Sequence, residues 1–259
     1  ARFTGATQPR RMPSIGAQKY VALAYAQKGF TDYAESGDVN VIGTALAKAA
    51  GLDSWDFYFR NLSDAYLLRM EQDLSEPNLS DEDLKQRFVN AYTGVLNNAS
   101  RSTQVDPGNY LNWITLGNVY ETIALPPFGI AGAYEEATKR YTQARELNPT
   151  SPIIPFRLAR LEAGMGNYDK ALDFVAQSLV IKSNYTPALF LGSQIEVERG
   201  NLDGAIERAE QASLIAPSDI GVLFQLGFLR YRNEEYKRAV TALERAVELN
   251  PEYSNAKYF

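Results

Sequence analysis

The side chains that carry most enzymatic chemistry are missing from this chain. It contains no cysteine and no histidine, which excludes disulfides, Cys/His zinc sites, Cys-His dyads and Ser-His-Asp triads. Carboxylates remain, but a carboxylate pair performs acid-base chemistry on a glycoside only inside a desolvated cleft. The charges at Glu207-Arg208 and from Glu234 to Arg238 have the pattern of a solvated helix face instead. We therefore expect no catalytic residue, no metal site and no cofactor.

Composition limits the partners of the chain as well. Its 259 residues include 31 acidic and 26 basic ones, which gives a net charge of -5. Nucleic-acid affinity comes from clustered Lys and Arg, so we expect no nucleic-acid partner. The longest apolar stretch, around Val21 to Ala26, is far shorter than the roughly 18 to 20 residues of a membrane span. We expect no direct membrane insertion of this chain, which lacks an initiator Met and reads as a piece of a longer protein.

A repeat of 34 residues runs through the second half of the chain. The segment from Ile220 reads IGVLFQLGFLRYRNEEYKRAVTALERAVELNP, and the segment from Thr186 reads TPALFLGSQIEVERGNLDGAIERAEQASLIAP. A third segment, from Pro152, has the same length, with Ser183 where the others have Pro217 and Pro251. Because a repeat of this length indicates one structural unit that recurs, we assign the secondary structure within each 34-residue segment.

Each segment holds two apolar stretches with helical spacing. A short turn joins them, at Gly166-Asn167, Gly200-Asn201 and Asn233-Glu234. Small residues recur in phase in the second stretch, at Ala171, Ala205 and Ala239 and again at Ser178, Ala212 and Ala246. Two helices approach to about 8 to 10 Å only where the crossing side chains are short. The pattern therefore predicts a helical hairpin, which the closing proline ends.

These hairpins resemble the tetratricopeptide repeat. In the last full unit the resemblance is carried by Leu226-Gly227, Tyr236, Ala239, Leu243, Ala246 and Pro251. It implies an all-α fold, a right-handed superhelical solenoid of helical hairpins. It also implies a non-catalytic scaffold that binds a protein or peptide partner.

The resemblance divides the chain into six hairpins with a short piece at each end. Residues 1–22 are expected to be an N-terminal extension that leads into the first helix, and residues 23–109 two degenerate repeats. The second of these carries a long insertion near Glu76 to Asp83, with a helix N-cap at Ser80. Residues 110–253 form four repeats, the first with an eight-residue insertion around Ala124 to Ala131, and residues 254–259 start a truncated further repeat.

In this family the first helices of successive units line a groove that holds extended partners. Carrying the variable groove positions over to this sequence gives the candidates Asn118, Phe156, Arg160, Phe190, Gln194, Phe224, Phe228 and Tyr231. Phe156, Phe190 and Phe224 stand one repeat apart and would form an aromatic ladder. Aromatic residues and Arg are enriched at binding hot spots. An aromatic residue that recurs in phase also suits the core between repeats, so both interpretations stay open.

A second resemblance concerns the setting of the repeats. The phrases from Asp106 to Trp113, from Leu147 to Pro152 and from Pro251 to Ala256 resemble repeat domains attached to bacterial O-antigen ligase-like or polymerase-like membrane proteins. This implies a soluble extracytoplasmic region of a protein of surface-polysaccharide assembly, with a membrane domain elsewhere in the full-length chain. A cytoplasmic location is the alternative. A third hypothesis, an enzyme acting on glycans, is disfavoured because no catalytic constellation supports it.

Overall fold

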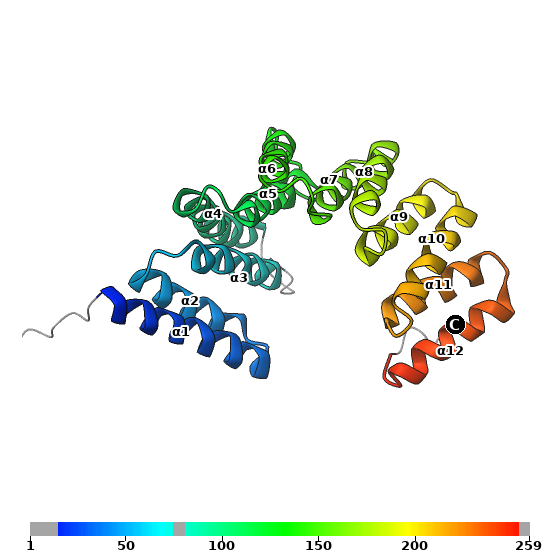
Figure 1. Cartoon of the computed structure of the whole chain (residues 1–259), viewed down its shortest axis with the longest axis horizontal. Helices are drawn as coiled ribbons and strands as arrows, with labels where there is room; N and C mark the ends of the chain where they lie inside the picture. Colours follow the sequence, from blue (N-terminus) through cyan, green and yellow to red (C-terminus); the bar gives the residue numbers. More distant parts are fainter. Residues whose placement is uncertain (1–14, 75–80, 254–259) are drawn as a thin grey trace, which may run out of the picture. The chain divides into compact units, whose positions relative to one another are not determined.

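The computed structural model describes residues 15–74 and 81–253, and every regular element in those ranges is an α-helix (Figure 1). The helices are α1 (Ile15–Ser36), α2 (Val39–Leu52), α3 (Asp56–Leu74), α4 (Asp81–Val105), α5 (Tyr110–Ala124), α6 (Ala133–Leu147), α7 (Ile153–Gly164), α8 (Tyr168–Ile181), α9 (Thr186–Glu198), α10 (Leu202–Ile215), α11 (Ile220–Arg232) and α12 (Tyr236–Leu249). Three predicted features lie outside the described residues: the start of the N-terminal extension, the N-cap at Ser80 and the truncated further repeat. The helices group into two compact units, divided between Val119 and Tyr120 within α5.

The first unit contains two packed helix pairs, α1 with α2 and α3 with α4. A close approach joins the first pair, since a Cβ placed on Gly29 would lie 2.4 Å from the Cβ of Ala45. Helix α1 begins at Ile15, within the range predicted as an extension. Helices α3 and α4 are 19 and 25 residues long. Of the insertion predicted near Glu76 to Asp83, residues 81–83 belong to α4 and residues 76–80 lie outside the described residues.

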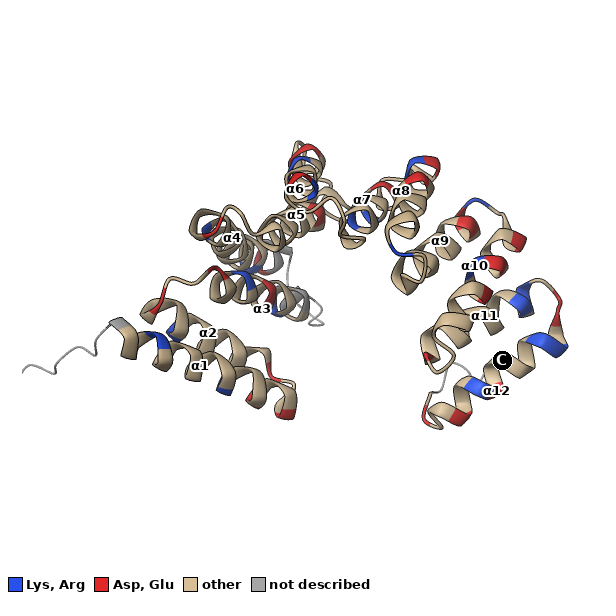
Figure 2. Ribbon diagram, viewed as in Figure 1, with Lys and Arg blue, Asp and Glu red and all other residues tan. Residues whose placement is uncertain are grey.

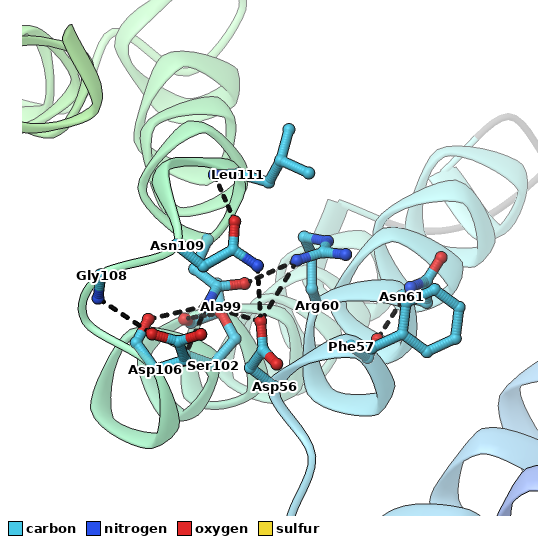
Figure 3. A network of polar contacts seen from close by, with 11 residues as sticks. Asp56, Phe57, Arg60, Asn61, Ala99, Ser102, Asp106, Gly108, Asn109 and Leu111 are labelled. Carbon is cyan, nitrogen blue, oxygen red and sulfur yellow. Dashed lines mark hydrogen bonds and ion pairs between the residues drawn. The ribbon is translucent and has the colours of Figure 1, made fainter. Parts of the chain in front are cut away.

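A buried polar network fastens α3 to the connection between α4 and α5 (Figure 3). The carboxylate of Asp56 accepts hydrogen bonds from Asn109 Nδ2 at 2.8 Å and from Asn112 Nδ2 at 2.9 Å, and it contacts Arg60 at 3.4 Å. Asn112 also accepts from Arg60 at 2.9 Å and donates to the carbonyl of Ser102 at 3.1 Å. Both Asp56 and Asn112 are buried, so the network satisfies groups that would be costly to bury alone.

The second unit holds the hairpins α7–α8, α9–α10 and α11–α12, which have 34-residue spacing. Their turns place Gly166, Gly200 and Glu234 in the left-handed region, with φ of 78°, 76° and 62°. The predicted small residues Ala205 and Ala239 are buried. A Cβ on Gly227 would lie 2.6 Å from Leu243 Cγ, which shows why small residues are required where α11 and α12 cross.

Candidate binding groove

A hollow of about 640 Å³ opens in the second unit between α9 and α11. Its walls carry Phe190 and Gln194 from α9 and Phe224 and Phe228 from α11. Each pair is four residues apart and so lies on one face of its helix. We call the surface formed by these four residues the aromatic groove.

The helix ends explain how the groove is positioned. Helix α9 has proline at its first turn, where a missing N–H costs no hydrogen bond. The N-cap Asp219 of α11 accepts a hydrogen bond from the Val222 backbone N–H at 3.0 Å. Gln225, which also lines the hollow, donates to the Ser193 hydroxyl at 3.2 Å, and that hydroxyl donates to the Ala205 carbonyl at 2.8 Å. These bonds link α11 to the α9–α10 hairpin.

The rings of the groove support one another and remain half-buried. Phe224 and Phe228 are stacked, with centroids 6.1 Å apart and an interplanar angle of 18°. Tyr253 meets Phe224 edge-on at 5.6 Å and also lines the hollow. Edge-on and offset-stacked arrangements are the favourable ones for aromatic rings. The rings therefore form a fixed apolar surface that still faces the hollow.

Three polar side chains at the groove are open to a ligand. Gln194, Glu198 and Arg232 line the hollow and are exposed (charged residues of these helices are coloured in Figure 2). Within the described chain these side chains make no hydrogen bond or ion pair. The groove thus offers an apolar floor with an amide, one negative charge and one positive charge beside it.

The structure places the other four predicted residues elsewhere. Phe156 packs edge-on against Tyr185 at 5.7 Å, in a cluster with Ala159 and Ala188. Tyr231 meets Tyr236 at 5.8 Å, and Asn118 is half-buried in α5. None of these residues, nor Arg160, lines the hollow. The proposed ladder of three phenylalanines is therefore reduced to Phe190 and Phe224 at this site.

Arg160, predicted to lie in the groove, pairs with a buried carboxylate. Its Nε lies 2.7 Å from Glu121 Oε1, and Glu121 is buried. Glu121 also accepts a hydrogen bond from the hydroxyl of Tyr141. Burial of that phenol and the neighbouring Glu121 charge raise the pKa of Tyr141 well above its ordinary value. The predicted groove cation thus forms part of a structural ion pair.

Two further buried carboxylates occupy the same position in successive repeats. Glu162 accepts hydrogen bonds from Tyr134 at 2.7 Å and Asn167 at 2.8 Å and pairs with Lys170. Glu196 likewise accepts from Asn201 at 2.9 Å. Burial alone would raise the pKa of Glu162, but the bonds from Lys170, Tyr134 and Asn167 together lower it. Glu162 and Glu196 therefore link each turn to the helix before it. The sequence did not indicate this role, because nothing in it distinguishes a buried Glu from an exposed one.

The described residues also bear on other kinds of site. Across residues 15–74 and 81–253, no group of three or more acidic side chains is placed to hold a metal ion. None of the helices described in those ranges is both long enough and apolar enough to cross a bilayer. Sequence reasoning missed Tyr168, Glu198, Gln225 and Tyr253 as groove-lining residues. Of these, Tyr253 stands beyond the helix of its own hairpin, where the repeat pattern gives no signal.

Comparison with known proteins identifies the repeat. Residues 130–187 and residues 221–253 each match a family model described as the tetratricopeptide repeat. The chain contains tetratricopeptide repeats. Among curated relatives, the anaphase-promoting complex subunit CDC16 of Saccharomyces cerevisiae is 26% identical over 184 residues, covering 68% of this chain and 21% of the relative.

Solved structures agree with this tetratricopeptide assignment. A thermophilic tetratricopeptide repeat protein from Thermus thermophilus has a TM-score of 0.61 at 18% identity, covering 85% of this chain and 99% of that one. The APC/C hetero-tetramer Cut9-Hcn1 has a TM-score of 0.60 at 13% identity, covering 93% of this chain and 42% of that one. These likenesses confirm the fold class predicted from the sequence, an all-α solenoid of tetratricopeptide-type hairpins.

The chain corresponds to a small part of each curated relative. This tetratricopeptide chain spans between 5% and 21% of the length of the first curated relatives it matches. The resemblance to O-antigen ligase-like membrane proteins is not tested by these relatives. That resemblance, and the extracytoplasmic location that it implies, stay predictions.

Proposed function

We propose that this tetratricopeptide repeat protein is an interaction scaffold that holds an apolar peptide segment of a protein partner in the aromatic groove. Its relatives support the scaffold role, since CDC16 and subunit 3 are named as subunits of the anaphase-promoting complex. A second related fold belongs to a hetero-tetramer. The groove itself is supported by one observation, the hollow lined by Phe190, Phe224 and Phe228.

The chemistry of the groove indicates which segment it holds. Its half-buried rings can still bury further apolar area, so a leucine or phenylalanine of the partner would occupy the hollow. Gln194 can both donate to and accept from a peptide backbone, and Arg232 can pair with a partner carboxylate. Aromatic and Arg residues commonly carry most of the energy of an interface. Catalysis has no part in this proposal.

Selection of peptides from a random displayed library on the intact chain tests the proposal. The selected peptides should share an apolar residue at one position and should bind Phe228→Ser at least tenfold more weakly than the native chain. Gln194→Ala should weaken binding less, because its amide lies at the exposed edge. Tyr236→Ser is the matched control, since Tyr236 is 56% exposed on α12 and does not line the hollow.

Folding must be separated from binding in this experiment. Phe228 stacks on Phe224, so each variant is first compared with the native chain by thermal denaturation. Gln194→Ala should leave the melting temperature unchanged because its side chain is exposed. Selected peptides that bind the folded Phe228→Ser and Gln194→Ala variants as tightly as the native chain would exclude the aromatic groove as the site.

A further inference from the structure

A second hollow lies in the first unit, among residues of α1, α3 and the connection that joins α2 to α3. Its volume is about 580 Å³. The described residues that line it include Lys19, Tyr20, Leu23, Asp53, Trp55 and Tyr58. Three of the eight lining residues are aromatic, whereas aromatic residues make up 12% of the chain. We call this surface the Trp55 hollow.

Trp55 is held in place and yet remains exposed. Its ring stacks on Phe57 at 4.9 Å with an interplanar angle of 29°, and it meets Tyr58 edge-on at 5.3 Å. Its backbone N–H donates to the Asp53 carbonyl at 3.0 Å. Even so, 45% of Trp55 is exposed. A rigid ring that faces solvent offers contact area without loss of side-chain freedom on binding.

Tyr20 also lines the hollow and is the most exposed aromatic residue described in α1, at 78%. Tyr58 contributes to the hollow while being almost completely buried. Leu23 adds an exposed aliphatic surface. The hollow thus has apolar walls that packing among the described residues leaves uncovered, which is typical of a binding surface.

Three polar groups of the Trp55 hollow have no partner within the described chain. The indole N–H of Trp55, the hydroxyl of Tyr20 and the carboxylate of Asp53 make no hydrogen bond or ion pair there. The other tryptophan differs, because the Trp113 indole donates to the Pro107 carbonyl at 2.8 Å. The indole N–H and the Tyr20 hydroxyl, both donors, and the Asp53 carboxylate therefore remain available to a ligand.

We propose that the Trp55 hollow binds a proline-rich segment of a partner protein in the polyproline II conformation, with a basic residue beside Asp53. Prolines present apolar ring faces that pack on Tyr20 and Trp55, and their carbonyls accept from the indole N–H. Because proline has no N–H, such a segment has few backbone donors to satisfy, and Asp53 supplies an acceptor for its basic side chain. The conformation forms before binding, so little entropy is lost. This site is independent of the aromatic groove.

Fluorescence anisotropy of a labelled peptide on the full chain tests the proposal. The probe is a peptide of prolines with one arginine, and the comparison peptide alternates glycine and serine around one arginine at equal length. The proline peptide should bind at least tenfold more tightly than the glycine-serine peptide. Tyr20→Ser should weaken its binding at least fivefold. Tyr236→Ser, at an exposed tyrosine of the other unit, should leave it unchanged.

Two further variants test the contributions of the indole N–H and of the carboxylate separately. Trp55→Phe keeps a ring to pack on Phe57 and removes the indole donor, so it should weaken the proline peptide while the fold is retained. Asp53→Asn should weaken the arginine-containing peptide about two- to fivefold and leave an all-proline peptide unaffected. Because Tyr20 projects into solvent, Tyr20→Ser should fold normally, which circular dichroism checks.

Several results would overturn the proposal. One is undetectable binding of the proline peptide at millimolar concentration. Another is equal binding by the native chain and a folded Tyr20→Ser variant. A neutral oligosaccharide that binds in a Tyr20- and Trp55-dependent manner, where the proline peptide does not, would assign the hollow to glycans instead.

Discussion

Replacing Glu234 by glycine should stabilise the last hairpin. Glu234 has a φ of 62°, whereas Gly166 and Gly200 occupy the same place in the two preceding hairpins with φ of 78° and 76°. The backbone hydrogen bond is the same in kind, since the N–H of Glu234 donates to Tyr231 at 3.1 Å and that of Gly200 to Val197 at 3.0 Å. Only the residue type differs at a turn geometry that the three hairpins share.

The expected gain follows from two opposing terms. An L-residue other than glycine in this region costs about 1–2 kcal/mol, and glycine loses about 0.5–1 kcal/mol more conformational entropy on folding. The difference is a stabilisation of about 0.5–1 kcal/mol. The Glu234 side chain is exposed and has no hydrogen bond within the described chain, so its removal should contribute little.

Urea denaturation and hydrogen exchange of the α11 and α12 amides measure this gain. Stability in a chain of repeats is largely local. Hydrogen exchange of these amides therefore measures the stability of the last hairpin more directly than urea denaturation of the whole chain. Glu234→Ala controls for the lost carboxylate and should change stability by less than half as much. Gly200→Ala is the reciprocal control, since a Cβ there meets no atom within 4 Å, and it should cost about 1 kcal/mol. A neutral or destabilising Glu234→Gly, beside a destabilising Gly200→Ala, would refute the reasoning.

Three other changes should give measurable results. Ala239→Leu should cost about 1–3 kcal/mol through overpacking at a buried crossing, and an unchanged melting temperature would show that the site tolerates volume. Asp56→Ala should cost about 3 kcal/mol, because it removes a buried acceptor that Arg60, Asn109 and Asn112 share; a cost equal to that of the exposed Asp173→Ala would contradict a role for the network. Because the folded-state pKa of Glu162 lies below its ordinary value of 4.5, its contribution is complete above that pH and is lost as pH falls through the lower folded value. Glu162→Gln should therefore flatten the fall in stability below about pH 4.5, and an unchanged acid slope would show that another group controls it.

The sequence alone determined the repeat and much of the local structure. A 34-residue period, small residues at Ala205 and Ala239, and glycines at the turns specify helical hairpins, because helix spacing, close crossing and positive φ are requirements on single residues or on near neighbours. These features can be recognised from the sequence because each depends on residues that are close together in it. The composition likewise excludes cysteine and histidine chemistry.

Only the tertiary structure decided which in-phase residues face a ligand. Phe156 and Phe190 occupy the same position of their repeats, but Tyr185 packs edge-on against Phe156 while Phe190 faces the hollow beside Phe224. Arg160 has a groove position in the repeat, yet Glu121 of the preceding hairpin binds its guanidinium. The outcome at each position depends on a residue in a neighbouring helix, and a burial or an ion pair exists only when both partners are in place. The repeat determines the position of a side chain on its helix, whereas the residues of neighbouring helices determine what that side chain contacts.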